Sequence, residues 1–302
     1  MRELLFAPKY CYGFRCIADA CRHSCCIGWE IDVDDETLAR YRALPGEIGT
    51  RIRASLCEAD GVVSFSLCED GRCPHLDARG LCRIQTALGE GALCEICREH
   101  PRFYHTAGGK VEFGIGASCE EAARLILSSK DYASIQTADG VAEGASPEGG
   151  FDALEKRRAL YALLGDDSRP YAARRAEIAA RFALRRTLSG NALRETLAAL
   201  EYLEQAHRAL LLSPKSGEAD EAHAPLAERF LAYLVYRHAS AAQSEEEFAT
   251  KVSFALLVES LFTALLQHCP PVEAAITLSE ELEYSVENTD TLCFALLAAN
   301  RA

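Results

Sequence analysis

The sequence lacks an apolar segment long enough to be recognised as a membrane-spanning helix. Its longest apolar run extends from Phe254 to Leu266 and contains Glu259, whereas a span needs about 20 mostly apolar residues. The opening residues, MRELLFAPKY, also lack the apolar core of a signal peptide. We therefore expect a soluble, cytoplasmic protein that makes no membrane contact.

A glycine-rich nucleotide-binding loop is missing as well. The run VEFGIGAS offers a Gly-x-Gly pair, but the third glycine is absent and no alternation of strands and helices surrounds the run. No repeat of solenoid period is visible in the chain. These absences exclude a dinucleotide-binding fold and a repeat array.

Cysteine is scarce in the second half of the chain and dense in the first. Twelve of the 14 cysteines lie within the first 119 residues, and only Cys269 and Cys293 lie beyond them. Thiols in a reducing compartment are rarely paired as disulfides, and cysteines used as small core residues would be spread more evenly. The clustering therefore predicts metal or redox chemistry in the first part of the chain.

The chain is large enough for about two domains, because it has 302 residues of which 49% are hydrophobic and 25% charged. We expect a mainly α protein. A cysteine-rich metal-binding domain of helices, turns and a few short strands is expected over residues 1–135, a linker or loop rich in Gly, Ala, Ser and Pro over 136–150, and a helical bundle over 151–302. Five runs after the linker place apolar residues at helical spacing: FDALEKRRALYALL, RAEIAARFALRRTL, NALRETLAALEYLEQAHRALLL, PLAERFLAYLVYRHA and EEEFATKVSFALLVESLFTALLQHC.

Three signals predict where helices of the bundle begin and end. Pro225 fits the first turn of a helix, and Ser244 followed by Glu247 matches a capping box. The pair Pro270-Pro271 is expected to stop the helix that reaches Cys269.

The negative charge of the chain is concentrated in the predicted bundle. The first 130 residues carry 16 basic and 19 acidic residues, whereas the remainder carries 16 basic and 26 acidic residues. An acidic surface repels nucleic acid and anionic membrane, and it would attract a lysine-bearing partner. The plainer interpretation is that the charge serves only solubility.

The thiols of the first segment fall into spaced groups that suit metal ligands. Two cysteines two residues apart can approach one ion, and Cys21 and Cys25 would share one face of a helix. Adjacent Cys25 and Cys26 would point about 100° apart on a helix, so one is expected to face the site and the other the core or a second site. The predicted ligands are Cys16, Cys21, Cys25, Cys26, Cys73, Cys82, Cys94, Cys97 and Cys119. The ungrouped cysteines are expected to serve as small hydrophobic residues: Cys11, Cys57, Cys68, Cys269 and Cys293.

Cys119 has a local environment of its own in the sequence. Ser118 followed by Glu121 matches a capping box, which predicts that Cys119 occupies the first position of the helix CEEAARLIL. The positive end of the helix dipole would then lower the pKa of the thiol toward the thiolate that metals bind. The alternative is an inert cysteine at a capped helix.

Thiolate-rich sites select zinc or iron-sulfur clusters. Arginines interleave the cysteines and would neutralise either centre. The irregular spacing C-x4-C-x3-C-C does not repeat the paired knuckles of structural zinc sites, so it favours a [4Fe-4S] cluster, with zinc as the alternative.

At these motifs the chain resembles a known family. The order PKY, F-x-C-I-x4-C-x3-C-C-x-G-W, EDGRCPHLDARGLCRIQTALGEGALCEICREHPR and SCEEAARLIL is similar to that of the flagellin lysine-N-methylase (FliB) family, part of a wider group of CxxCxxCC zinc- or iron-chelating proteins. YLVYRH at 233–238 and EYSVENTDTL at 283–292 resemble its later segments. The chain departs from the pattern in its extra Cys11 and Cys68 and in His100, where the family usually has an aromatic residue.

The resemblance implies S-adenosylmethionine-dependent methylation of lysines on flagellin or another lysine-bearing protein, with a cysteine-bound cluster. Among the matching motif residues, Arg98, Arg102 and Arg124 are candidates for cofactor binding. Displacement and radical methyl transfer both stay open. A non-catalytic zinc- or iron-sulfur-binding adaptor or redox sensor is the alternative function.

Methyl transfer to lysine requires the neutral amine, whose ordinary pKa is about 10.4. Side chains near the motifs are weak candidates for orienting the amine or accepting its proton. Trp29, the only tryptophan, could stack on a cationic sulfonium or lysine, although core packing is the plainer interpretation. The full candidate set is Tyr12, Trp29, Asp32, Glu121, Tyr284 and Glu287.

Overall fold

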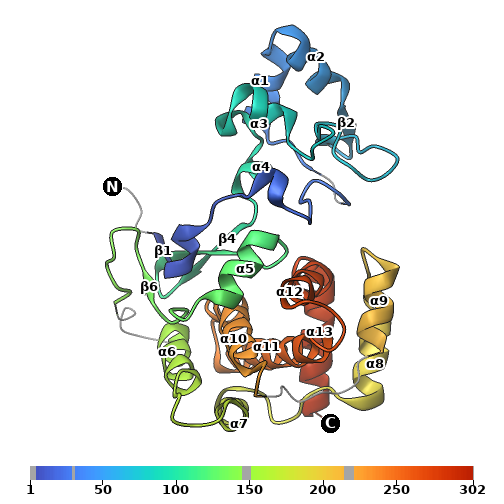
Figure 1. The fold of residues 1–302 in the computed structure, drawn as a ribbon. Helices are drawn as coiled ribbons and strands as arrows, with labels where there is room; N and C mark the ends of the chain where they lie inside the picture. Colours follow the sequence, from blue (N-terminus) through green and yellow to red (C-terminus); the bar gives the residue numbers. More distant parts are fainter. Residues whose placement is uncertain (1–4, 29–30, 145–150, 214–220, 302) are drawn as a thin grey trace. The chain divides into compact units, whose positions relative to one another are not determined.

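The computed structural model describes residues 5–28, 31–144, 151–213 and 221–301, and within these ranges the chain is mainly α, as predicted (Figure 1). By their contacts the residues form two compact units. The cysteine unit comprises Arg15–Phe103. The helical unit comprises the residues up to Phe14 and those from Tyr104 onward.

The cysteine unit contains short elements around a small core. A two-stranded hairpin turns at Asp60 and Gly61, whose φ values of 50° and 82° suit the tight turn of an Asp-Gly pair. The core holds Ile31, Tyr41 and Phe65 together with buried Cys73 and Cys94. The elements are η2 Ala18–Ala20, α1 Asp35–Ala43, α2 Gly46–Ala54, β2 Leu56–Ala59, β3 Val62–Phe65, α3 Arg83–Leu88, η3 Glu90–Ala92 and α4 Glu95–Glu99.

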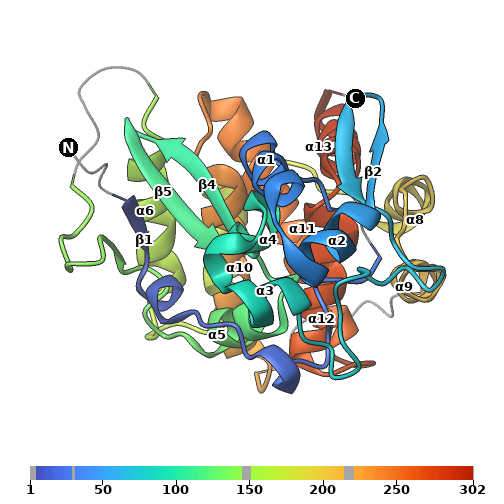
Figure 2. The same ribbon diagram turned by 90° about the horizontal axis from the view of Figure 1, so that it is seen from above.

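The helical unit contains a four-stranded sheet with the order β4-β5-β1-β6. Strand β1 (Leu5–Pro8) pairs in parallel with β5 (Lys110–Ile115), with Phe6 opposite Glu112, and pairs antiparallel with β6 (Ile135–Gln136). Strand β4 (Arg102–Ala107) joins β5 through the Gly108-Gly109 turn, where both φ values are positive. Figure 2 shows β4 and β5 as neighbouring arrows.

Helices form the rest of the helical unit, and α10 and α11 are its most buried elements. The Phe230 ring of α10 lies 4.4 Å from the Phe262 ring of α11, centroid to centroid. The elements are η1 Lys9–Gly13, α5 Glu120–Ser128, α6 Ala153–Leu164, α7 Tyr171–Phe182, α8 Gly190–Ala198, α9 Gln205–Leu212, α10 Ala224–Ala239, α11 Glu245–Leu265, α12 Pro271–Leu278, the π-helix η4 Ser279–Glu283 and α13 Val286–Arg301.

Two of the three predicted helix boundaries are confirmed. The Ser244 hydroxyl accepts a hydrogen bond from the Glu247 N–H at the start of α11, and Pro225 lies in the first turn of α10. The prediction for Pro270-Pro271 was wrong, because α11 already ends at Leu265 and Pro271 instead begins α12. The Cys269 N–H bonds to the Leu265 carbonyl in the turn between the two helices.

The division into units differs from the domain boundaries expected from the sequence, at 1–135, 136–150 and 151–302. Strands before Phe14 and after Tyr104 pair with each other, so both flanks of the cysteine unit join the helical unit. Part of the expected linker is held in place, since Ala142 bridges to Gln136 and Glu143 makes buried ion pairs. The remainder of that linker, 145–150, lies outside the described residues.

Helix α11 is the one described helix long and apolar enough to span a membrane, with 21 residues and a mean hydropathy of 1.5 over its most apolar window. That window is 83% buried inside the protein. Its Glu259 is buried and accepts hydrogen bonds from Tyr171 and Arg175. Helix α11 is thus packed as a core helix.

Candidate functional site

Backbone hydrogen bonds hold the cysteine motifs together within the cysteine unit. The Cys73 N–H bonds to the Cys26 carbonyl at 2.8 Å, and the Gly28 N–H bonds to the Gly71 carbonyl at 3.0 Å. The Asp34 carboxylate caps α1 by accepting from the Thr37 N–H and also accepts from the Glu95 N–H, at the start of α4. These contacts join positions that lie 43, 47 and 61 residues apart in the chain.

Five of the nine predicted ligands pack against one core. Cys73 and Cys94 are buried in it, and Cys26, Cys82 and Cys97 are partly buried against it. We call these five residues the cysteine group. Their sulfurs act on one another electrostatically, since the ionisation of Cys26 is affected by Cys73 and Cys82, and that of Cys97 by Cys94, Cys26 and Cys82.

Two thiol pairs within this region differ in their readiness to ionise. A hydrogen bond from Cys26 lowers the pKa of Cys25 to about 7, and a hydrogen bond from Cys97 lowers the pKa of Cys94. The pKa values of the donors Cys26 and Cys97 are raised, because each shares its proton with the neighbouring sulfur and is buried. Each pair therefore holds one thiolate more readily than two.

The two cysteines of the second motif are harder to ionise. Burial raises the pKa of Cys73 to about 11 and also raises the pKa of Cys82. Two residues after Cys73, the buried His75 ring bonds through Nε2 to the Ser55 hydroxyl at 2.9 Å. Burial lowers the pKa of His75 to about 4. A neutral histidine thus supports the loop that carries Cys73.

By donor type, the cysteine group fits a thiolate-bound zinc or iron-sulfur centre. Within the described part of the chain, however, no set of three or more His, Cys, Asp or Glu side chains is arranged as a ready metal site. The match between the cysteine group and such a centre therefore rests on the presence of five cysteine sulfurs around one core. The assignment of the nine cysteines as ligands stays a prediction.

Three other predicted ligands lie in the first motif, outside the cysteine group. Cys16 and Cys25 are exposed, and Cys21 is half-buried with its thiol donating to the His23 carbonyl at 2.7 Å. The expectation that Cys21 and Cys25 share a helix face was wrong, because η2 ends before Cys21 and Cys25 lies in a turn. Cys57 and Cys68 are exposed as well, so they do not serve as core residues.

Cys119 belongs to the helical unit. It occupies the position before the first turn of α5, where no side chain caps the helix, so the expected capping box from Ser118 to Glu121 was wrong. Glu121 instead pairs with Arg124 at 2.6 and 2.7 Å. The Cys119 side chain packs against an apolar cluster that includes Cys11 and Phe113.

The segments YLVYRH (233–238) and EYSVENTDTL (283–292) of the helical unit meet at the buried Glu283 carboxylate. Tyr233 donates its hydroxyl to Glu283 Oε2 at 2.9 Å, and His238 Nε2 lies 2.7 Å from Glu283 Oε1. The Tyr233 hydroxyl accepts hydrogen bonds from the Ala117 N–H, next to the third motif, and from Arg237. We call Tyr233, Arg237, His238 and Glu283 the motif junction.

The charges of the motif junction follow from its burial. Burial opposes ionisation of Glu283, but Arg237 and the hydrogen bond from His238 hold the pKa of Glu283 below its ordinary value. Burial lowers the pKa of His238 despite the neighbouring carboxylate. The junction is therefore an ionised carboxylate that accepts from a neutral histidine and a tyrosine, beside a positive arginine.

Replacing Glu283 by glutamine is expected to lower the free energy of unfolding by about 2 kcal/mol, because charged hydrogen bonds to a buried carboxylate are lost. The matched control is Glu287→Gln on α13, since Glu287 is exposed. Denaturant unfolding of the two variants measures the difference. Equal stabilities would show that the junction adds nothing to the fold.

The structure places the remaining candidates in separate surroundings. The Tyr12 hydroxyl donates to the Gln136 carbonyl at 2.9 Å, and burial raises the pKa of Tyr12 to about 12. Asp32 is exposed, and Trp29 lies outside the described residues. Tyr284 is 44% exposed, and the Arg237 guanidinium lies 4.8 Å from the centre of its ring.

Of the three predicted cofactor-binding arginines, two lie beside the cysteine group. Arg98 directly follows Cys97 and pairs with Glu99 at 3.3 Å, and Arg102 donates to the Arg98 carbonyl. The third, Arg124, is bound to Glu121 on α5. Glu283 was not predicted as a site residue, although it begins the segment EYSVENTDTL, and no local sequence signal marks it as buried, because Leu282 before it is buried and Tyr284 after it is exposed.

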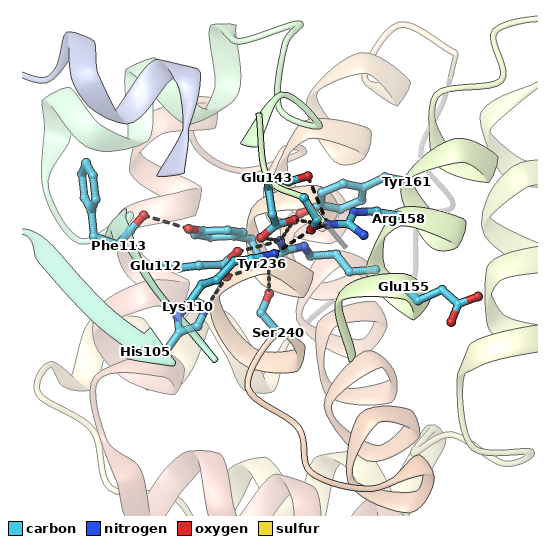
Figure 3. Close-up of polar contacts among 12 residues, drawn as sticks. His105, Lys110, Glu112, Phe113, Glu143, Glu155, Arg158, Tyr161, Tyr236 and Ser240 are labelled. Atoms are coloured by element: carbon cyan, nitrogen blue, oxygen red, sulfur yellow. Dashed lines mark hydrogen bonds and ion pairs between the residues drawn. The ribbon is translucent and has the colours of Figure 1, made fainter. Parts of the chain in front are cut away.

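A second buried ionic network surrounds Arg157, and its partners Glu112, Glu143 and Ser240 are labelled in Figure 3. Its guanidinium donates two hydrogen bonds of 2.7 Å to Glu112, and it also bonds to Glu143 and to the Ser240 hydroxyl. Arg157 and Glu112 are completely buried. His105 Nε2 lies 2.7 Å from Glu112 Oε2, and the Tyr236 hydroxyl of the YLVYRH segment donates to the Phe113 carbonyl. We call this the Arg157 network, and we assign it to the stability of the fold.

Comparisons with known proteins give a consistent relationship. The Lysine-N-methylases of Salmonella typhimurium strain LT2 and Salmonella choleraesuis strain SC-B67 are each 29% identical over 175 residues, or 54% of this chain and 42% of theirs. The flagellar biosynthetic protein FliU of Salmonella muenchen is 30% identical over 143 residues, covering 43% of this chain and 82% of FliU. This chain belongs to the flagellin lysine-N-methylase family.

The predicted membership of the flagellin lysine-N-methylase family is thereby confirmed. The match covers less than half of the length of the two Lysine-N-methylases. No family model and no solved structure matches the chain.

Proposed function

We propose that this family member is an S-adenosylmethionine-dependent protein-lysine N-methyltransferase that acts on flagellin or a flagellin-like protein. The observation that carries the proposal is the similarity to two proteins named Lysine-N-methylase and to FliU. The acidic composition of the helical part supports it, because a negative surface attracts a lysine-bearing substrate.

We further propose that the cysteine group would hold a [4Fe-4S] cluster. A bound cluster with an open iron position would supply a site for the amino and carboxylate groups of S-adenosylmethionine. Around it, the chain offers Arg98 and Arg102 as positive charges that offset the negative charge of several thiolates. Cys94, whose pKa is lowered by Cys97, is the buried thiol most ready to bind metal.

Two exposed residues, Tyr284 just after η4 and Glu287 in the first turn of α13, are our candidates for contacting the substrate lysine. Tyr284 and Glu287 are exposed and lie next to the motif junction in the sequence. S-adenosylmethionine, when bound, supplies a methyl group activated by a sulfonium. The residues of the chain would then orient the lysine amine and favour loss of its proton, since only the neutral amine is nucleophilic.

The test is methyl transfer to purified flagellin. The full chain, purified without oxygen, is incubated with flagellin and S-adenosylmethionine carrying an isotopically labelled methyl group, and lysine methylation is read by mass spectrometry. We expect labelled lysines, and we expect Tyr284→Phe and Glu287→Gln to raise KM more than they lower kcat. Metal-loaded protein that leaves flagellin unmodified would overturn the proposal in favour of a metal-binding adaptor or redox sensor.

A further inference from the structure

The helical unit contains a groove that belongs to neither of the sites described above. It encloses about 1140 Å³ and is lined by residues of α7, α8, α9 and α11 and of the segment between α7 and α8. These helices are labelled in Figure 1. Its walls are largely leucine, with Leu197 and Leu211 buried at the base and Leu193 half-exposed. Alanine side chains from α7 and α11 also line the groove, and their small size leaves the space open.

The charged residues that line the groove are all positive. They are Arg175, Arg185 and Arg194, and none of the described lining residues is Asp or Glu. Arg175 is engaged with Glu259 and Ser260. Arg185 and Arg194 are exposed, and neither side chain makes a hydrogen bond or an ion pair with another described residue.

This local charge is opposite to that of its surroundings. Residues from 131 onward carry 26 acidic and 16 basic side chains, so this part of the chain has a net negative charge that disfavours an acidic partner. At the groove, by contrast, the exposed Arg185 and Arg194 side chains lie among leucines and would attract an acidic partner. Charge therefore determines where an acidic partner would bind.

The dimensions and chemistry of the groove favour a protein helix as its ligand. A cation such as a sulfonium or a lysine would meet no carboxylate among the lining residues. The volume also exceeds the range of about 300–1,000 Å³ that is usual for small-molecule pockets. An amphipathic helix places apolar side chains at i, i+3, i+4 and i+7 into such a groove and keeps its polar residues at the rim.

We propose that this groove binds an acidic amphipathic helix of a partner protein. The apolar stripe of that helix lies on the leucine walls, and its Asp or Glu side chains pair with Arg185 and Arg194. The inference goes beyond methyl transfer, because it requires neither metal nor S-adenosylmethionine. It adds a binding surface to the helical unit.

The test uses fluorescence anisotropy with the full chain and a labelled peptide of about four helical turns. The peptide carries leucines at helical spacing and glutamates elsewhere. We expect saturable binding that weakens with salt, and at least a tenfold loss of affinity in the Arg185→Glu/Arg194→Glu double variant. The matched control is Arg186→Glu, because Arg186 is the exposed neighbour of Arg185 but does not line the groove. This control should bind like the wild type.

Peptide controls separate this proposal from nonspecific attraction. A peptide of the same composition with its leucines out of helical register, and a peptide with lysine in place of glutamate, should both bind at least tenfold more weakly. The proposal is overturned if the scrambled peptide binds equally well, or if the double variant retains full affinity. It is also overturned if palmitate binds the groove while the acidic helix does not, because the site would then accept a lipid anion.

Discussion

Replacing Arg157 by methionine is expected to lower the free energy of unfolding by about 3–5 kcal/mol at neutral pH. The substitution removes the positive charge and leaves Glu112 as a buried carboxylate without its principal partner, next to Glu143, whose pKa burial and Glu112 raise to about 7. Removing one partner of a buried ionic group is more harmful than removing the whole group, because the remaining charge is not solvated. Urea unfolding followed by circular dichroism measures the loss.

The pH dependence of this variant provides a second measurement. In the wild type, burial opposes ionisation of Glu112, but Arg157 and His105 hold the pKa of Glu112 well below its ordinary value. Glu112 therefore stabilises the fold above the ordinary carboxyl pKa, and this stability is lost as the pH falls through the lower folded value. Without Arg157, burial raises the carboxyl pKa and the protonated form is favoured. The stability difference should therefore shrink as the pH falls from 7 toward about 5.

Arg158→Met is the control, because the Arg158 side chain is 40% exposed and bonds to the same Glu143 at 3.2 Å. The Arg158→Met substitution should lower the free energy of unfolding by no more than about 1 kcal/mol. A similar loss in both variants would show that burial of the Arg157 network is not the source of its stabilising effect. If the stability difference between the wild type and Arg157→Met did not change with pH, the assignment of Glu112 as an ionised carboxylate would be contradicted.

Replacing Cys94 by serine is expected to reduce the metal content of the purified protein to background. Cys94 is almost fully buried and lies in the cysteine group, where its hydrogen bond from Cys97 favours the thiolate. A hydroxyl is a much poorer ligand for zinc or iron-sulfur iron than a thiolate. Elemental analysis and the visible spectrum after anaerobic purification measure both the metal and its type.

Cys57→Ser is the matched control, since Cys57 is exposed on β2, lies outside the cysteine group and places its thiol 3.3 Å from the Ser64 hydroxyl. It should keep the metal content of the wild type. Because Cys94→Ser could also disturb the core, Cys97→Ser and the circular dichroism of each variant are measured in parallel. Bound metal in both folded variants would exclude this pair as ligands, and zinc without iron would contradict the proposed cluster.

Secondary structure within the helical unit was largely accessible from sequence, because it depends on local periodicity and caps. Ser244 illustrates this, since its hydroxyl accepts a hydrogen bond from the N–H of Glu247, which is only three residues later in the chain. The long run from Asn191 to Leu212 shows the limit, because it forms α8 and α9 with a break at 199–204. The buried Glu281 carboxylate causes this break: it accepts from the Leu203 and Glu204 N–H groups and bonds to His207 Nδ1 at 2.7 Å.

Part of the candidate site could likewise be predicted from local sequence patterns. Spacing alone indicated the cysteines, and the structure gathers Cys26 and Cys73 through a backbone hydrogen bond that no sequence pattern specifies. The helical pairing of Cys21 with Cys25 failed because a turn, not a helix, follows η2. The contact between Glu283 and His238 joins positions 45 residues apart, so only the tertiary fold could reveal it.

The parallel pairing of β1 with β5 has a consequence for how the chain folds. The whole cysteine unit lies between these two strands in the sequence, so their pairing closes a loop that contains it. Loop closure becomes entropically harder as the number of flexible residues rises, by about 0.6 kcal/mol for each doubling. A metal ion that orders the cysteine unit would shorten the flexible part of that loop. Metal supply during synthesis would thereby influence how readily the sheet of the helical unit assembles.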